Sequence, residues 1–294
     1  MAKTSFSGPV RSENGFKLIS KNTTSGLISD RTVHDLGIKD TRRYYLEEYF
    51  NLLPGINGDL ASTTESTNTP VSRSFEILGT NHTSALATYS TTVAGMAMTT
   101  ATADQDRMIV APHLDTKQTA WAGTKWGTEN QVHWECGIRT SAAIDNQLIW
   151  AGLKLTNVVE GAADDDQAFF TFATDSSNAG TAFSDFTLLH FIHSIGGTDY
   201  ISALPITVAA STNYHLKIVF DSDRKVSIFV DGVQYNITST AGSTGGTSVT
   251  TGTTKSAAMT DDVNLIPYIG IENGDAAAAV LNVQFEAISR LIFE

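Results

Sequence analysis

Apolar and polar residues alternate most regularly in the stretch Asn213–Ile237, NYHLKIVFDSDRKVSIFVDGVQYNI. Apolar side chains occupy every second position in two runs, first at Leu216, Ile218 and Phe220 and then at Val226, Ile228 and Val230. This period places each run on one face of a strand. Ser222–Lys225 separates the runs with turn-forming residues, and Asp231-Gly232 favours a type I′ hairpin turn, whose central residues need positive φ. The stretch therefore predicts three strands joined by two tight turns.

Short runs of the same kind follow one another from Arg73 to the end of the chain. The predicted strands are residues 73–79, 84–89, 93–99, 107–112, 131–139, 148–155, 168–173, 186–193, 200–208, 213–220, 225–230, 233–238, 264–272 and 279–293. In the last run, Leu281, Val283, Phe285 and Ala287 alternate with Asn282, Gln284 and Glu286, which predicts a half-buried strand. So many short strands at close spacing predict an all-β jelly-roll sandwich of two sheets.

The chain before Arg73 has a different pattern. Residues 1–33 show little periodicity and predict an extended N-terminal arm with scattered apolar anchors. Residues 40–53, DTRRYYLEEYFNLL, predict one short helix, since Asp40 can cap it, apolar residues recur at helical spacing, and Pro54-Gly55 ends it. We therefore expect an anchoring and oligomerisation segment over residues 1–56, a polar linker over 57–72 and a β-sandwich domain over 73–294.

A low-complexity segment interrupts the predicted sandwich at Ser239–Ala258, STAGSTGGTSVTTGTTKSAA. A loop of this length inside a compact domain is usually functional or mobile. Two interpretations stay open at this point. The segment is either a flexible tip or a piece of chain that orders against a neighbouring subunit.

Composition and charge narrow the class of function. The 294 residues are 41% hydrophobic and only 17% charged, with a formal net charge of −12. An acidic chain of this kind is a poor ligand for nucleic acid or for an anionic membrane. No signal peptide and no apolar run long enough to span a membrane is visible, so we expect assembly in a cytoplasm.

The search for chemistry is mostly negative. The sequence lacks the common nucleophile, phosphate-binding, dinucleotide-binding and zinc-protease motifs. Cys136, the one cysteine, shares a predicted strand face with Trp134 and is expected to be a buried small hydrophobe. His190 and His193 lie three apart on a predicted strand, so they point to opposite faces and cannot hold a metal together.

Two further groups of residues are candidate binding sites. Asp164–Asp166, with Asp175 nearby, is an acidic cluster that could invite Ca²⁺, but no calcium loop motif accompanies it, and we predict no metal site. Among the tryptophans, Trp134 and Trp150 are expected in the core. Trp121 and Trp126 lie in a Gly/Thr-rich loop and are the candidates for an exposed sugar-stacking surface.

Asn213–Ile237 resembles a recurring piece of concanavalin A-like sandwiches, which include lectins, hydrolases and inert structural modules alike. The opening SFSGPVRSENGF resembles the N-terminal arm of virion structural proteins from tailed bacteriophages. Ala151–Leu155 (AGLKL), Asp166–Phe170 (DQAFF) and Tyr214–Ile218 (YHLKI), in that order before the Val230-Asp231-Gly232 hairpin, are similar to a sandwich found in phage capsid-decoration and fibre-like proteins.

The phage resemblance implies a non-enzymatic virion protein that decorates or cements a capsid, located in the virion and bound to the major capsid protein or other virion proteins. It also implies a homo-oligomer, often a trimer, an arm that grips the shell, and no catalytic residue or cofactor. The partner-binding candidates are then Phe6, Pro9, Val10, Phe16, Tyr45 and Tyr49.

Two alternative functions stay open from the sequence. The first is a glycan-binding adhesion module on a phage fibre or tail, with Trp121 and Trp126 as its candidates. A carbohydrate-active enzyme is disfavoured, because no pair of facing carboxylates is visible.

Overall fold

The computed structural model describes residues 18–21, 28–31, 42–56, 72–113, 119–155, 164–174, 183, 185–242 and 246–292. The chain divides into two compact units, Met1–Thr41 and Arg42–Glu294. In the first unit, β1 (Leu18–Lys21) pairs antiparallel with β2 (Ile28–Arg31). The described part of the predicted arm is therefore a small hairpin rather than one extended segment.

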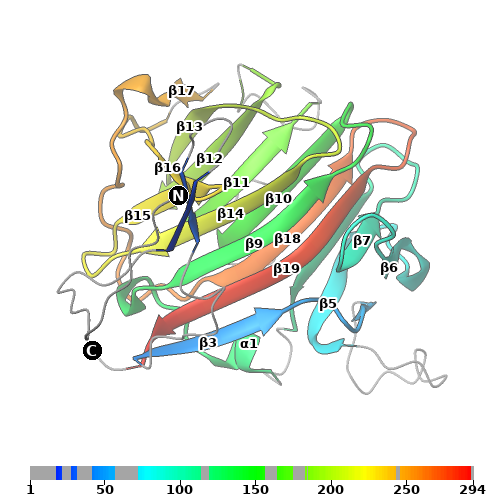
Figure 1. Ribbon diagram of the computed structural model, residues 1–294, viewed down its shortest axis with the longest axis horizontal. Helices are drawn as coiled ribbons and strands as arrows, with labels where there is room; N and C mark the ends of the chain where they lie inside the picture. The colour runs from blue at the N-terminus through cyan, green and yellow to red at the C-terminus, as the bar shows by residue number, and fades with distance from the viewer. Residues whose placement is uncertain are drawn as a thin grey trace, which may run out of the picture. The chain divides into compact units, whose positions relative to one another are not determined.

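The second unit is built almost entirely of strands within the described residues (Figure 1). Its strands are β3 (Arg43–Glu48), β4 (Pro54–Ile56), β5 (Ser72–Thr80), β6 (Ala87–Tyr89), β7 (Met96–Thr99), β8 (Arg107–Pro112), β9 (His133–Thr140), β10 (Gln147–Lys154), β11 (Gln167–Ala173), β12 (Leu188–Ile195), β13 (Thr198–Thr207), β14 (Asn213–Phe220), β15 (Val226–Val230), β16 (Val233–Tyr235), β17 (Thr247–Ser248), β18 (Ile266–Asn273) and β19 (Val280–Leu291). Its helical pieces are η3 (Ser84–Leu86), α1 (Ala120–Gly123), η4 (Thr128–Asn130) and η5 (Val249–Thr251).

The strands form two sheets that pack face to face. Counting described residues only, one sheet has nine strands in the order β17-β13-β12-β11-β10-β18-β8-β5-β4. The other has eight, in the order β16-β15-β14-β9-β19-β7-β6, with β3 also paired to β19. Neighbours in the sheets are often distant in sequence, as in a jelly roll. The predicted all-β, concanavalin A-like sandwich is confirmed.

The stretch with the clearest alternation folds as predicted. β14, β15 and β16 are successive antiparallel strands. Asp231 and Gly232 have φ of 50° and 80°, which is the left-handed conformation that a type I′ turn needs. Leu216, Ile218 and Val226 are buried between the sheets, so the local pattern determined both the strands and their inward face.

The prediction of a helix over residues 40–53 is wrong. Arg43–Glu48 is instead the strand β3, paired with Glu286–Leu291 of β19 (Figure 1). Aromatic and β-branched residues suit a strand surface, and the ladder to β19 satisfies backbone groups that a helix would otherwise satisfy internally. Leu46 packs on the main cluster, and Tyr44, which is 37% exposed, stacks on Trp126 at 6.2 Å.

The segment expected to anchor the chain therefore contributes strands to both sheets, since β4 pairs with β5 in the nine-stranded sheet. Residues 57–71 of the predicted linker lie outside the described residues.

A β-bulge reverses which side chains of β19, the last strand, face the core. The pairing of β19 with β9 shifts between Val283 and Phe285. The extra residue reverses the inward and outward positions after the bulge. Glu286 consequently faces the core beside Trp134, and Phe285 lies on the outer face against the rings of Tyr49 and His215. The regular alternation predicted for 279–293 is thus correct before the bulge and reversed beyond it.

Most of the low-complexity segment Ser239–Ala258 lies against its own chain. Thr247–Ser248 forms β17, parallel to β13. Gly252–Asn264, which we name the strap, bonds along the edge formed by β15 and β16, where Ile237 and Thr253 exchange backbone hydrogen bonds and the Ser256 amide donates to the carbonyl of Val226. Residues 243–245 lie outside the described residues.

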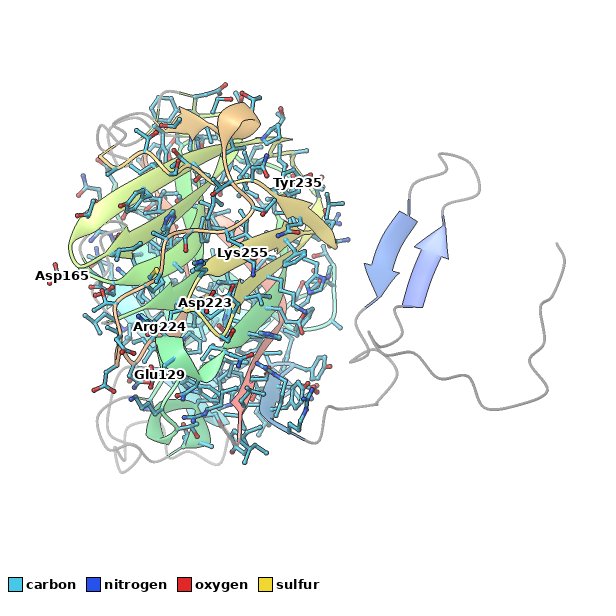
Figure 2. All side chains as sticks on the ribbon, turned by 90° about the vertical axis from the view of Figure 1, so that its left-hand side faces the viewer. Glu129, Asp165, Asp223, Arg224, Tyr235 and Lys255 are labelled. Atoms are coloured by element: carbon cyan, nitrogen blue, oxygen red, sulfur yellow. The ribbon has the colours of Figure 1, made fainter. Side chains whose placement is uncertain are left out.

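Ion pairs between exposed side chains reinforce the strap. Lys255 pairs with Asp221, and Arg224 lies 3.6 Å from Asp261. Figure 2 shows Asp223, Arg224 and Lys255 on the same side of the molecule. None of the helices in the described ranges has the length and apolar character needed to cross a bilayer.

Candidate partner-binding surface

Exposed aromatic side chains gather where β3 ends. Tyr49 and Tyr89 are 53% and 54% exposed, and Leu52 is 42% exposed. Tyr89 Oη donates a hydrogen bond to the carbonyl of Asn51 at 3.0 Å, and the rings of Tyr49 and Phe285 are 6.1 Å apart. We name Tyr49, Leu52, Tyr89 and the half-buried Phe285 the aromatic patch. Large exposed apolar groups that gather in one region are typical of a surface that binds a partner.

Phe50 explains why Tyr49 points outward. Its φ is 53°, in the left-handed region, and its side chain is fully buried. The Phe50 amide donates to Oε1 of Glu48 at 2.7 Å, and its ring packs edge-on against Phe75 at 5.5 Å. The chain therefore turns sharply after β3, with Phe50 as the inward anchor and its neighbour Tyr49 left on the surface.

A row of charged and polar side chains continues from the patch across the eight-stranded sheet. His215 Nε2 lies 2.8 Å from Oε2 of Glu135, and Lys217 Nζ lies 3.9 Å from the same oxygen. The His215 ring is 5.7 Å from Phe285. Aromatic anchors beside hydrogen-bonding and charged groups are the composition of protein interfaces.

His133 lies on the same outer face but is not a cation. Burial, and then the positive charges of Arg43 and Lys217, lower the pKa of His133 to about 3. Arg43 and Lys217 are cations on this face, and Arg43 Nε donates a hydrogen bond to the Ser289 hydroxyl at 3.1 Å.

The predicted partner-binding residues divide into two groups. Tyr49 is in the aromatic patch, and Tyr45 is a half-buried neighbour on β3, opposite Ser289 of β19. Phe6, Pro9, Val10 and Phe16 lie outside the described residues. The structure thus brings the two tyrosines to one sheet edge and leaves the four arm residues as predictions.

The tryptophans proposed for glycan binding are buried, so the expectation that they are exposed is wrong. Trp121 is 4% exposed and Trp126 is 1% exposed. Trp121 packs edge-on against Phe75 at 4.8 Å, and Trp126 Nε1 donates to the Trp121 carbonyl at 2.7 Å. The Gly/Thr-rich loop folds back onto the end of the core, because these rings bury more apolar area there than they would by facing water. Trp134 and Trp150 are buried, as predicted.

His190 and His193 lie on opposite faces of β12, as their spacing predicted. The ring of His190 packs on Phe183 at 4.3 Å, whereas His193 stacks between Phe191 and Tyr200 on the other face. Burial lowers the pKa of both histidines to about 4, so both are neutral. Asp165 is exposed while Asp164 and Asp166 are buried, and no group of three metal-ligating side chains gathers among the residues described.

The outer face of the nine-stranded sheet is a second buried layer that the sequence did not predict. Trp150 stacks on Tyr268 at 6.1 Å, and Lys154 Nζ lies 5.0 Å from the centre of the Tyr268 ring. A Cβ on Gly270 would come within 2.5 Å of the Trp150 indole, so this glycine is what lets the ring lie flat on the sheet.

Trp150, Lys154 and Tyr268 are at most 1% exposed. The two rings belong to a second apolar cluster with Phe183 and Phe186. Because they are covered, they form packing rather than an open binding platform.

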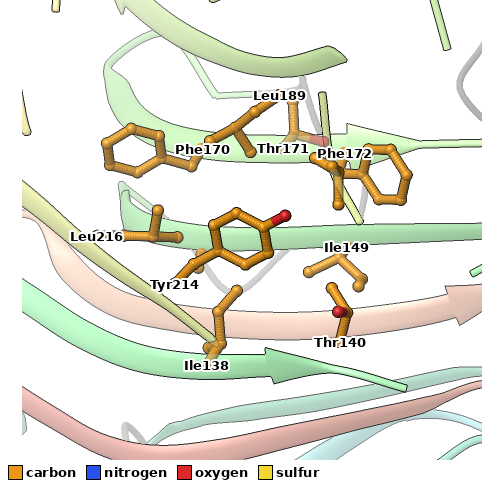
Figure 3. Close-up of a pocket in the computed structure, with 11 residues that line it drawn as sticks. Ile138, Thr140, Ile149, Phe170, Thr171, Phe172, Leu189, Tyr214 and Leu216 are labelled. Atoms are coloured by element: carbon orange, nitrogen blue, oxygen red, sulfur yellow. The ribbon is translucent and has the colours of Figure 1, made fainter. Parts of the chain in front are cut away.

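A small cavity lies between the sheets at the end where β9, β11 and β14 meet (Figure 3). Its volume is about 20 Å³, close to that of one water molecule. Apart from Thr140, Thr171 and the Tyr214 hydroxyl, which accepts from the Ala209 amide, its lining is apolar. A space of this size and character is a packing void and not a ligand site.

Sequence reasoning missed Glu286, whose carboxyl group is fully buried. Its Oε1 accepts from Trp134 Nε1 at 2.7 Å, while Oε2 has no hydrogen-bond partner. Burial raises the pKa of Glu286 to about 8. One signal was present in the sequence: Glu286 shares a period of two with Ile288, so counting back from Ile288 would have placed it inside.

Comparisons with known proteins identify no family. No family model matches the chain, and no curated protein matches it. A protein of unknown function from Shewanella oneidensis MR-1 is 12% identical with a TM-score of 0.48, over 92% of this chain and 97% of that one.

Two sugar-related structures are similarly distant. Peanut lectin is 8% identical with a TM-score of 0.46, over 86% of this chain and 99% of the lectin. A glycoside hydrolase family 16 endo-glucanase from Bacteroides ovatus is 9% identical with a TM-score of 0.46, over 83% of this chain and 99% of that one.

Proposed function

We propose that this protein is a non-enzymatic structural protein of a bacteriophage particle, which binds the capsid shell through its N-terminal segment and the aromatic patch. The observation that carries the proposal is the patch itself, where Tyr49, Leu52 and Tyr89 stay exposed beside Phe285. Tyrosines supply large contact area at low entropic cost when a partner covers them.

The position of the patch along the chain supports docking rather than chance exposure. Tyr49 directly follows β3, and β3 is the strand by which the chain enters the sandwich from the first unit. A partner that bound the first unit and the patch would hold two linked contacts, and linked contacts strengthen binding through effective concentration. The likeness of SFSGPVRSENGF to phage virion arms supports a capsid shell as that partner.

The glycan-binding alternative is not proposed here. The two rings that sequence assigned to it, Trp121 and Trp126, are buried in the core and present no face to a sugar.

The test uses empty shells assembled from the major capsid protein encoded in the same genome. We expect the full chain to co-sediment with the shells, and binding to weaken at least about tenfold when Tyr49 and Tyr89 are both replaced by serine. Val233→Ser is the matched control, because Val233 is 48% exposed but lies on β16, at the other edge of the same sheet. Equal binding by the tyrosine variant and the control, or absence of the protein from purified particles, would refute the proposal.

A further inference from the structure

Two carboxyl groups face each other beneath the aromatic patch. Glu286 of β19 is directly opposite Glu48 of β3 in the antiparallel ladder. Side chains at such positions share one face of the sheet, with Cβ atoms about 4.5–5.5 Å apart. For this pair it is the inner face, because Leu46 and Ile288, two positions away on each strand, pack on the main hydrophobic cluster.

The surroundings of Glu286 do not suit a negative charge. The side chain is fully buried, and Oε2 has no hydrogen-bond partner. Trp134 Nε1, at 2.7 Å from Oε1, is the hydrogen-bond donor that reaches the carboxyl group among the described residues. A buried carboxylate without a paired cation is strongly disfavoured relative to the neutral acid.

The titratable groups that face Glu286 add no positive charge. From β3 the facing group is Glu48, and from β9 it is Cys136, which is opposite Glu286 in the ladder. The nearby cations Arg43 and Lys217 are on the outer face, where they contact Ser289 and Glu135. Burial, and then the charge of Glu48, raise the pKa of Glu286, and burial also raises the pKa of Glu48.

We propose that Glu48 and Glu286 form a proton-controlled latch, which holds β3 on β19 while Glu286 is protonated and loosens β3 when Glu286 ionises. β3 carries one of the two facing carboxyl groups and pairs with β19 along its whole length, so a charge on Glu286 acts directly on this ladder. Opening would expose Glu286 to water and separate it from Glu48, which removes both causes that disfavour its charge.

The direction of the effect follows from proton linkage. Closed Glu286 holds its proton up to about pH 8, whereas the solvated group releases it near 4.5. Between these values the closed state binds one more proton than the open state, so closing becomes about tenfold less favourable for each unit of pH. The latch is therefore fully effective below about pH 4.5 and weakest above about pH 8.

Hydrogen exchange tests the latch in the full-length protein. We would measure protection factors, corrected for the intrinsic effect of pH on exchange, for amides of residues 43–48 and for β14 as an internal reference. The β3 amides should lose about tenfold in protection per pH unit between pH 6 and 8 and then level off, while β14 stays constant. Glu286→Gln should abolish this loss, because its amide cannot ionise.

The matched control is Glu47→Gln, which changes the adjacent carboxyl group on the outward position of β3. It should behave as the unmodified protein does. Glu48→Gln should move the pH at which the loss levels off to a lower value, because it removes a charge that raises the pKa of Glu286. This variant keeps the test valid if Glu286→Gln does not fold. The latch is refuted if the β3 protection does not depend on pH, if Glu286→Gln or Glu48→Gln retains the profile of the unmodified protein, or if β14 loses protection in parallel with β3.

Discussion

Cys136 and Glu286 are opposite each other on β9 and β19, and burial keeps both of them protonated. Burial raises the pKa of the Cys136 thiol well above its ordinary value of 9.0, with the charges of Glu286 and Glu135 acting in the same direction. A thiol that stays protonated is a weak nucleophile. The residue is thus a small apolar filler of the core, as its place in the sequence predicted.

Replacing Cys136 with alanine should therefore destabilise the protein by only about 1 kcal/mol, the cost of a small cavity. Urea unfolding measures this change. The thiol of the native protein should also resist a soluble thiol reagent and react completely after unfolding. Rapid labelling of the folded protein would contradict the assignment of Cys136 as an inert core residue.

The two residues differ in what the sequence could reveal. Cys136 follows from the simple alternation of β9, where Trp134, Cys136 and Ile138 share the inner face. Glu286 could not be placed by counting forward from Leu281, because the bulge at Gln284 inserts one residue into the period. A bulge is a tertiary feature, stabilised here by the space over Gly137, so single-strand periodicity does not detect it.

At the scale of elements, the bulge in β19 predicts that the effect of deleting one residue on stability depends on where in the strand the residue lies. Deleting Gln284 removes the extra residue and keeps Glu286 and Ile288 on the inner face, so the variant should fold with a loss of about 1–2 kcal/mol. Deleting Ser289 shifts only Arg290 and Leu291, so it should cost far less pairing than deleting Ala287. The Ala287 deletion reverses the face of Ile288 relative to Glu286 and shifts Ile288–Leu291 by one residue against β3.

Thermal melts followed by circular dichroism compare these variants. The Gln284 deletion should keep a cooperative transition and the Ala287 deletion should not. If both deletions melted alike, the inward position of Glu286 would not depend on the bulge.

β3 shows where sequence reasoning about elements stops. DTRRYYLEEYFNLL fits a helical period and a strand period almost equally, and only pairing with β19 decides between them. The strands of the sandwich itself were predictable, because β8 and β14 occupy the ranges 107–112 and 213–220 that alternation gave. The aromatic patch was predictable only in part, since Tyr89 comes from a strand distant in sequence.

Two truncations separate the contribution of the first unit to thermal stability from the contribution of β3. Removing Met1–Thr41 leaves every described strand of the second unit intact, so the melting temperature should change little. Removing residues 1–53 also deletes β3 and the buried Phe50, and loss of a buried phenylalanine alone costs about 3–5 kcal/mol. At about 2–4 °C per kcal/mol for a domain of this size, differential scanning calorimetry should record a fall of roughly 6 °C or more. Equal melting of the two truncations would show that β3 contributes no stability.

At the scale of the whole molecule, the proposed function requires assembly. We predict a symmetric homo-oligomer, most simply a trimer, in which the aromatic patch is wholly or partly covered. Light scattering at micromolar concentration should give a mass near three times 31.5 kDa. A monomer mass in the absence of shells would mean that the capsid is the partner that covers the patch.

The strap has a consequence for how copies of this protein could join. Sheet edges recruit further strands unless they are short or blocked. Among the described residues, the strap guards the β15–β16 margin, and β17, β4 and β6 are only two or three residues long. These margins therefore offer an incoming strand few backbone groups with which to pair. Short and covered edges of this kind limit backbone pairing between copies, so they protect the molecule from growing into fibrils even at the high local concentration of a particle surface.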